Sequence, residues 1–190
     1  MKIGLFFGSF NPIHCGHVAL AEHFVQCGLD EVWLVVSPQN PLKAASQLWD
    51  DRFRLHLAHL ALQEKPHLRV CDVEFSLPKP NYTINTLRAL QAQYPEYSFV
   101  LLIGADNAAS FDRWRDYQTI LRDFEVWCYP RTGFSLDSER FPQIRAVDAP
   151  LYDISATEVR QRLAAGQSIH SLVPECVEKE IAEFVRKKSL

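Results

Sequence analysis

Short apolar runs alternate along the chain with longer stretches in which apolar residues recur at helical spacing. The apolar runs predict strands at residues 3–7, 32–36, 68–73, 98–103, 126–129 and 144–147. The periodic stretches predict helices at residues 17–25, 50–63, 84–94, 117–122, 156–165 and 174–187. Strands separated by helices need crossover connections. The pattern therefore predicts an α/β fold with a mostly parallel sheet, helices on both of its faces and a C-terminal helical segment.

Length and composition fit one domain spanning residues 1–190. Of these residues, 47% are hydrophobic and 23% are charged, which is typical of globular proteins. The formal net charge of −3 argues against a broad basic surface for nucleic acid. The N-terminal apolar run is too short for a signal segment or a membrane crossing, and the 5 cysteines include no CxxC pair. We therefore expect a cytoplasmic protein that binds neither nucleic acid nor membranes.

The loop after the first predicted strand is the first place to look for chemistry, because ligands of a parallel sheet bind beyond the carboxyl ends of its strands. Residues 8–17 of this loop are GSFNPIHCGH. Gly8 allows the main chain to approach a ligand closely. His14 and His17 stand where a helix begins, and free amides and the helix dipole there favour an anion. The loop therefore predicts a phosphate site. A metal pair is disfavoured, since no third ligand of known spacing accompanies the two histidines.

A second phosphate-binding candidate precedes the helix predicted at residues 156–165. Ser155 and Glu158 form an S-x-x-E capping box, and a capped helix N-terminus is also a phosphate cradle. Arg160 adds a bidentate anion donor, although its spacing alone favours the surface. Lys43, after the second strand, and Arg131, after the fifth, are further loop cations whose default role is a solvated one.

Two motifs resemble those of a known superfamily. GSFNPIHCGH resembles the G-x-F-x-P-x-H-x-G-H motif of the nucleotidyltransferases, and ISATEVR at 154–160 resembles their I-S-S-T-x-x-R motif. Within that superfamily, NYTINTL at 81–87 and IGADN at 103–107, followed by Trp114, resemble the bacterial nicotinate-nucleotide adenylyltransferases. The chain departs from the common pattern at four positions, which affects details of hydrogen bonding and not the reaction: Ser9, Asn11, Asn85 and Ala156.

The resemblance implies a Rossmann-like fold and adenylyl transfer, in which the phosphate of nicotinate mononucleotide attacks the α-phosphorus of ATP. The products are nicotinate adenine dinucleotide, an intermediate of NAD biosynthesis, and pyrophosphate. The catalytic residues that it implies are His14, His17, Lys43 and Arg160. The ATP-binding residues that it implies are Gly8, Ser9, Phe10, His14, Gly16, His17, Ser155, Thr157 and Arg160. The mononucleotide-binding residues that it implies are Tyr82, Thr83, Thr86, Asp106, Trp114 and Arg131.

Individual residues of the mononucleotide set keep alternative interpretations. Trp114 suits stacking on the pyridine ring, and its charged neighbours favour a cleft over the core. Free amides near Tyr82 suit the nicotinate carboxylate. Asp106 is placed either to accept hydrogen bonds from ribose or an amide, or to cap the next short helix.

The cofactor and partner expectations follow from the same resemblance. Mg²⁺ is expected to travel with ATP, because the sequence shows no carboxylate cluster dedicated to it, and no protein metal site is expected. Three alternatives stay open: adenylylation of nicotinamide mononucleotide, adenylylation of phosphopantetheine, and a non-catalytic nucleotide sensor. A sensor predicts the loss of a phosphate ligand, and none is lost. A homo-oligomer is compatible with the sequence, which gives no direct indication of one.

Overall fold

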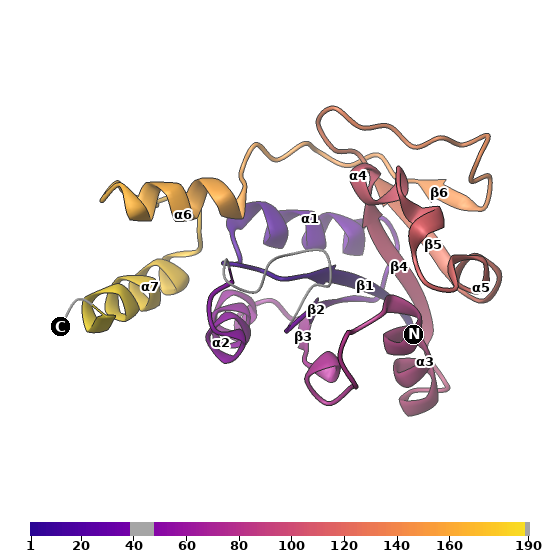
Figure 1. Ribbon diagram of the computed structural model, residues 1–190, viewed down its shortest axis with the longest axis horizontal. Helices are drawn as coiled ribbons and strands as arrows, with labels where there is room; N and C mark the ends of the chain where they lie inside the picture. The colour runs from indigo at the N-terminus through magenta and orange to yellow at the C-terminus, as the bar shows by residue number, and fades with distance from the viewer. Residues whose placement is uncertain (39–47, 189–190) are drawn as a thin grey trace.

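A six-stranded sheet in which all neighbouring strands pair in parallel forms the centre of the molecule (Figure 1). The computed structural model describes residues 1–38 and 48–188. The strands are β1 (Lys2–Gly8), β2 (Glu31–Val36), β3 (Leu68–Cys71), β4 (Ser98–Gly104), β5 (Glu125–Tyr129) and β6 (Ile144–Ala146). All six apolar runs that the sequence marked as strands are strands, and the predicted parallel sheet is confirmed.

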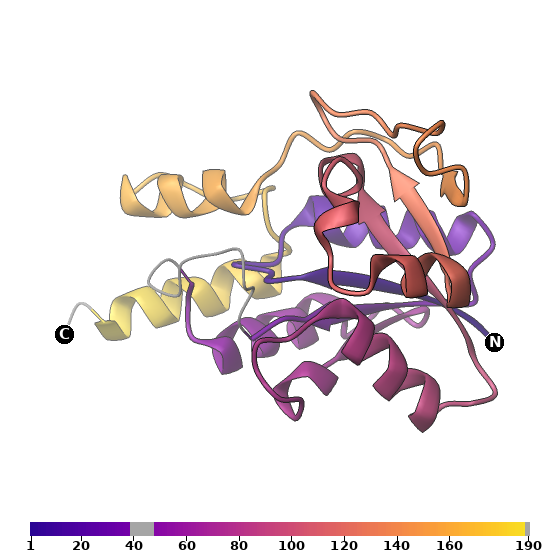
Figure 2. The same cartoon turned by 45° about the vertical axis from the view of Figure 1, so that its right-hand side comes forward.

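Helices cover both faces of the sheet (Figure 2). They are α1 (Cys15–Gln26), α2 (Asp51–Leu62), α3 (Thr83–Gln93), α4 (Ala105–Ala108), α5 (Tyr117–Asp123), α6 (Ala156–Ala164) and α7 (Glu175–Lys188). The core on one face combines side chains of α1, α2, α6 and α7, and the core on the other combines those of α3, α4 and α5. Successive residues of β1, such as Leu5 and Phe6, point into opposite cores, because side chains alternate across a strand.

The strand order β3-β2-β1-β4-β5-β6 places a topological switch point between β1 and β4. The chain runs outward from β1 to β3 on one side, returns to pair β4 with β1, and runs outward again to β6. The connections that follow β1 and β4 therefore diverge to opposite faces and leave a crevice at the carboxyl ends of these strands. Gly8 and Gly104 are the last residues of β1 and β4.

The C-terminal part of the chain packs against α1 and α2. The amide of Cys15, at the start of α1, donates to the carbonyl of Leu172 in the segment before α7 at 2.8 Å. Val177 and Ile181 of α7 are fully buried, and Phe184 stacks on Phe53 of α2 with ring centroids 4.0 Å apart. Figure 1 shows α6 and α7 side by side at one end of the molecule, beyond the sheet.

Four local features differ from the sequence prediction. Helix α1 begins two residues earlier than expected, since the side chain of His14 caps it. Strand β3 ends at Cys71 because a 3₁₀ turn, η2 (Val73–Phe75), follows it. Helix α4 was anticipated only as the short helix that Asp106 could cap, and a second 3₁₀ turn, η3 (Phe111–Arg113), was not predicted, because elements of one turn carry no measurable periodicity.

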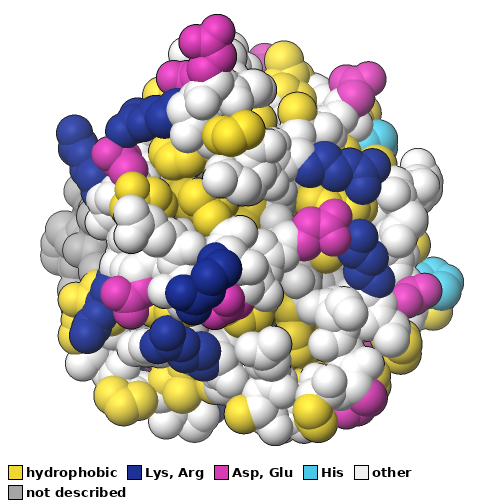
Figure 3. Space-filling view, turned by 90° about the vertical axis from the view of Figure 1, so that its right-hand side faces the viewer, with side chains coloured by type: hydrophobic (Ala, Val, Ile, Leu, Met, Phe, Trp, Pro, Cys, Tyr) yellow, Lys and Arg dark blue, Asp and Glu magenta, His cyan; other side chains and the backbone are white. Residues whose placement is uncertain are grey.

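The surface and the helix lengths bear on the expectations about partners. On the face that Figure 3 shows, Lys and Arg side chains lie among Asp and Glu side chains and form no continuous basic area. Within the described parts of the chain, every helix is too short or too polar to cross a membrane.

Candidate active site

A cavity of about 300 Å³ opens at the switch point, beside the carboxyl ends of β4 and β5. Segments far apart in the sequence line it: the start of α1, the residues just beyond β4 and β5, and the segment that leads into α6. The predicted site residues that line this cavity are His14, Gly16, His17, Asp106, Arg131 and Ser155. The fold therefore joins parts of both phosphate motifs and of the mononucleotide set in one place.

His14 and His17 cap the N-terminus of α1 with their own side chains. The amide of His17 donates to Nδ1 of His14 at 3.3 Å, and the amide of His14 donates to Nδ1 of His17 at 3.2 Å. This is the reciprocal arrangement of a capping box. Because each Nδ1 accepts a hydrogen bond, each neutral imidazole carries its hydrogen on Nε2. The loop thus supplies two ring N–H donors beside the positive end of a helix dipole.

His14 is a neutral donor at physiological pH. Its side chain is 6% exposed, and burial, with a smaller contribution from the guanidinium of Arg131, lowers its pKa to about 4. The imidazole of His14 therefore gives an anion a hydrogen bond without a positive charge. The positive charge in the cavity comes instead from Arg131.

Phe10 explains why glycine occupies position 8. Phe10 is 2% exposed, adopts φ of 42°, and packs edge-on against His17 with ring centroids 5.0 Å apart. A Cβ at Gly8 would lie 2.8 Å from the ring of Phe10. The sequence prediction assigned Gly8 to close approach by a ligand, whereas in the structure the ring of Phe10 is what excludes a side chain there. Phe10 supports His17 and does not line the cavity.

Gly16 is constrained by its neighbours in a similar way. A Cβ on Gly16 would lie 3.1 Å from Cβ of Tyr152 and 3.2 Å from Nδ1 of His14. The absence of a side chain lets the segment before α6 approach the start of α1 closely. Gly16 therefore shapes the cavity wall that the two phosphate motifs share.

Ser9 is a buried residue of the loop after β1, and its main-chain carbonyl accepts a hydrogen bond from Arg54. The sequence analysis missed Arg54. Arg54 is 0% exposed, and its guanidinium donates to carbonyl oxygens of Ser9, Ser37, Pro38 and Trp49. A signal was present in the sequence, because Arg54 lies one turn before Leu57 and Ala58 on the apolar stripe of α2. A cation at such a position indicates a buried network of acceptors.

Asp106 lines the cavity and forms an ion pair with Arg131 there. Its Oδ1 is buried and makes no hydrogen bond to any described residue, and Nε of Arg131 lies 3.6 Å away. A Cβ on Gly104 would collide with this oxygen, which explains the glycine at the end of β4. The N-cap of α4 is Gly104, so the alternative interpretation of Asp106 as a helix cap is wrong.

The second motif forms the N-terminus of α6 next to the loop after β1. Oγ of Ser155 accepts from the amide of Glu158 at 3.1 Å, as predicted. The reciprocal half of the expected capping box does not form, because the carboxylate of Glu158 pairs with Arg162 at 2.7 Å. Arg160 is half-buried and donates to the carbonyl of Asn11 at 2.6 Å and to the hydroxyl of Thr157 at 3.2 Å. Arg160 therefore connects the second motif to the loop after β1, and its contact with Thr157 stays within the second motif. Neither residue lines the cavity.

The start of α3 carries the remaining predicted residues. Helix α3 begins at Thr83, and backbone N–H groups in the first turn of a helix lack intrahelical partners. The guanidinium of Arg115 lies 4.8 Å from the ring centroid of Tyr82. Trp114 is half-buried and packs on Phe111 at 5.0 Å, on the side of the sheet that α3 covers. These residues lie outside the cavity itself.

Thr86 differs from its predicted role as a direct ligand contact. Thr86 is 0% exposed, its hydroxyl donates to Glu74 at 2.8 Å, and its amide donates to the carbonyl of Tyr82 at 3.3 Å. Both of its donors are occupied within the protein, so Thr86 supports the start of α3 from inside. The sequence pattern could not reveal this, because burial at a helix start depends on the tertiary neighbour.

Lys43 lies outside the described residues. The cavity wall also includes Tyr152, Asp153 and Ile154, which the prediction omitted although they directly precede the second motif. Among residues 1–38 and 48–188, no three His, Cys, Asp or Glu side chains are grouped so as to hold a metal ion.

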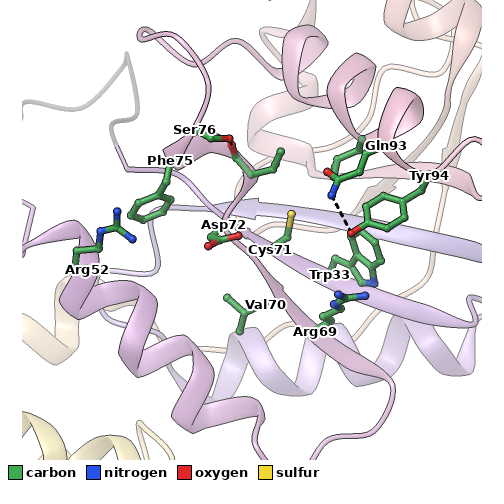
Figure 4. Close-up of a pocket in the computed structure, with 12 residues that line it drawn as sticks. Trp33, Arg52, Arg69, Val70, Cys71, Asp72, Phe75, Ser76, Gln93 and Tyr94 are labelled. Carbon is green, nitrogen blue, oxygen red and sulfur yellow. Dashed lines mark hydrogen bonds between the residues drawn. The ribbon is translucent and has the colours of Figure 1, made fainter.

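A second cavity, of about 390 Å³, lies at the edge strand β3 (Figure 4). Arg52 and Arg69 lie over the rings of Phe75 and Trp33, 5.0 and 4.8 Å from their centroids. None of the predicted site residues lines it. We therefore place the candidate active site in the smaller cavity at the switch point.

Comparison with known proteins gives a consistent assignment. A family model described as cytidylyltransferase-like matches residues 5–162. A protein of Bacteroides fragilis named "Probable nicotinate-nucleotide adenylyltransferase" is 46% identical over 184 residues, covering 96% of this chain and 92% of its own. A protein of Flavobacterium psychrophilum with the same name is 44% identical over 193 residues, covering 98% of this chain and 100% of its own.

The fold is similar to that of a solved relative. The nicotinic acid mononucleotide adenylyltransferase of Plasmodium falciparum, solved in complex with NaAD, superposes with a TM-score of 0.80 at 17% identity, covering 96% of this chain and 95% of its own. The same enzyme in complex with APC gives a TM-score of 0.79. The Rossmann-like fold is thereby confirmed. On the family model and the curated relatives, the chain belongs to the cytidylyltransferase-like family and, within it, to the nicotinate-nucleotide adenylyltransferases.

Proposed function

We infer that this protein is an enzyme that transfers the adenylyl group of ATP to nicotinate mononucleotide, releasing pyrophosphate and forming nicotinate adenine dinucleotide for NAD biosynthesis. Its membership of the adenylyltransferase family supports this activity. The observation that carries the inference is the cavity at the switch point, which combines a histidine-capped helix end with the ion-paired side chains of Arg131 and Asp106.

We propose that the triphosphate of ATP binds between the N-termini of α1 and α6. His14 and His17 supply N–H donors, and Arg131 supplies the positive charge. Phosphoryl and adenylyl transfer need little covalent help from the protein, because the reaction depends on alignment and on donors matched to the developing charge. The neutral imidazole of His14 suits this role, since it donates a hydrogen bond without having to lose a proton.

We propose that the mononucleotide binds between this cavity and the start of α3. The open amides of the α3 N-terminus and the guanidinium of Arg115 near Tyr82 favour a carboxylate over a neutral amide. Trp114 would stack on the pyridine ring, and Asp106 would accept a hydrogen bond from ribose or from a ring substituent. This charge preference is the physical basis for nicotinate over nicotinamide.

We propose that Mg²⁺ enters bound to ATP as part of the substrate, because the described part of the chain offers no group of carboxylates of its own. Lys43 remains a predicted phosphate contact, and Arg160 is proposed to act from the boundary of the two motifs. A cytoplasmic setting is proposed from the 5 cysteines, all of which are free thiols.

The test is pyrophosphate release from MgATP by the purified protein with nicotinate mononucleotide, nicotinamide mononucleotide and phosphopantetheine as separate acceptors. The inference predicts the highest kcat/KM for nicotinate mononucleotide. Preference for either other acceptor would replace the proposed substrate. Binding of ATP without release of pyrophosphate in the presence of any of the three acceptors would favour the sensor interpretation.

A further inference from the structure

Glu74 is a buried carboxyl that the reaction described above does not use. It lies in η2, is 2% exposed, and does not line the candidate active-site cavity. Burial raises its pKa, and hydrogen bonds from Ser37 and Thr86 offset part of this rise. Its Oε2 is buried without a hydrogen bond to any described residue. Burying such a carboxyl costs free energy, and a well-packed apolar side chain would stabilise the fold equally well.

On one side, Glu74 holds the start of α3 at two points. The hydroxyl of Thr86 donates to Oε1 of Glu74 at 2.8 Å, and Nδ2 of Asn81 donates to the main-chain carbonyl of Glu74 at 3.1 Å. Asn81 and Thr86 are both buried, and they flank Tyr82 and Thr83 in the sequence. The location of the open end of α3 is therefore set by its attachment to Glu74.

On the other side, Glu74 is connected to the loop after β1 through Ser37. The side chain of Ser37 lies near the carboxyl of Glu74 and lowers its pKa. The amide of Ser37 donates to the carbonyl of Gly8 at 2.9 Å, and the carbonyl of Ser37 accepts from Arg54 at 2.9 Å. Arg54 also binds the carbonyl of Ser9. Polar contacts thus lead from the phosphate loop through the half-buried Ser37 to Glu74 and the start of α3.

We propose that Glu74 is a positioning residue for the mononucleotide: it fixes the N-terminus of α3 relative to the phosphate loop, so that the nicotinate end of the acceptor is held in line with ATP. The inference rests on the proposed function, since it concerns the acceptor of that reaction. Glu74 touches neither substrate; its carboxyl acts through Thr86 and lies near Ser37, whereas the bond from Asn81 goes to its main-chain carbonyl and is kept in every side-chain variant. Because Arg54 anchors the phosphate loop independently of Glu74, the effect of Glu74 falls on the acceptor and leaves ATP binding nearly unchanged.

The test compares three variants of the full chain. Glu74→Met removes the hydrogen-bonding groups and keeps a similar side-chain volume, and Glu74→Gln keeps acceptor and donor atoms at the same positions. Ser76→Ala is the matched control: Ser76 lies just after η2, is exposed, and its hydroxyl donates only to the carbonyl of Val73, at 2.9 Å. For each variant, kcat and the KM for each substrate are measured by pyrophosphate release, and stability is measured by urea unfolding.

Glu74→Met is expected to raise the KM for nicotinate mononucleotide by about tenfold, because the start of α3 must then be ordered when the acceptor binds. The KM for ATP is expected to stay within about twofold, and the urea midpoint is expected to fall slightly, because the buried hydroxyl of Thr86 loses its acceptor. Glu74→Gln should restore most of the acceptor affinity, and Ser76→Ala should match the wild type. An unchanged acceptor KM in folded Glu74→Met, or an equal rise in both KM values, would overturn the proposal.

A further variant keeps the proposal testable if Glu74→Met does not fold. Thr86→Val removes the hydroxyl that donates to Glu74 and keeps the shape of the side chain. It is expected to raise the acceptor KM selectively, and an unchanged acceptor KM counts against the proposal. Assays of the wild-type protein distinguish a failure of the proposed function from a failure of the proposed role of Glu74. No turnover of any acceptor refutes the proposed function, whereas turnover with an unaltered KM ratio in the variants refutes only the role of Glu74.

Discussion

Replacing Arg54 with methionine tests the buried network beneath the phosphate loop. The guanidinium of Arg54 is fully buried and donates to Trp49 at 3.0 Å, to Ser37 at 2.9 Å and to Pro38 at 2.8 Å, as well as to Ser9. All of these acceptors are main-chain carbonyl oxygens. Burial lowers the pKa of Arg54, and the nearby carboxylates of Asp50 and Asp51 oppose this shift. Methionine fills similar space and donates no hydrogen bond.

The expected loss of stability follows from the acceptors left behind. Each buried carbonyl that loses its partner costs at least about 1 kcal/mol, so the carbonyls of Ser9, Ser37, Pro38 and Trp49 together cost about 4 kcal/mol. At about 2–4 °C per kcal/mol for a chain of this size, the melting temperature falls by about 8–16 °C.

Urea unfolding of both proteins at pH 7 measures this difference directly, with the m-value as a check that the unfolding reaction is the same. Arg52→Met is the matched control. Arg52 lies on the same helix, is exposed, and contacts only the ring of Phe75 in the described structure, so its replacement should cost less than about 1 kcal/mol. A loss below about 1 kcal/mol for Arg54→Met would refute the assignment of Arg54 as the anchor of these loops.

Three further predictions concern the cavity. Burial lowers the pKa of His14 to about 4 from 6.5, so between these pH values the unfolded chain binds a proton that the folded chain does not bind. The free energy of unfolding should therefore fall by about 3 kcal/mol from pH 6.5 to 4, and urea titrations of His14→Asn should show a smaller fall over the same range. His17→Ala should lower kcat by about 10²-fold or more with an unchanged far-UV spectrum, and a drop below about fivefold in steady-state assays would remove His17 from the phosphate site. Gly104→Ala should displace Asp106 and raise the acceptor KM in the same assay. Gly28→Ala is the control: Gly28 has φ of 103° and no atom near the added Cβ, so this variant should lose stability and keep the acceptor KM unchanged.

Much of the fold could be predicted from the sequence because a parallel sheet requires strands that are apolar on both faces. The residues of β1, β2 and β4 are therefore continuous apolar runs, which stand out against helical periodicity. The start of α1 could not be predicted, since histidine is not a usual helix cap and the reciprocal bonds between His14 and His17 depend on their side-chain conformations.

The site could be predicted only where a motif marks it. The two phosphate motifs led to His14, His17 and Ser155, which the fold places in one cavity. The roles of Arg54 and Glu74 depend on which carbonyl or hydroxyl groups face them in the folded state, and no local pattern encodes that. Thr86 shows the same limit. Its place in a motif predicted a ligand contact, whereas in the folded state its hydroxyl donates to Glu74.

The central claim is tested most directly by following the α-phosphorus of ATP. With MgATP labelled at the α-phosphate and nicotinate mononucleotide as acceptor, the label is expected in a dinucleotide. With MgATP labelled at the γ-phosphate, the label is expected in pyrophosphate. Transfer of the γ-label to the acceptor, or release of the α-label as AMP with no dinucleotide formed, would contradict the assignment of adenylyl transfer to this cavity.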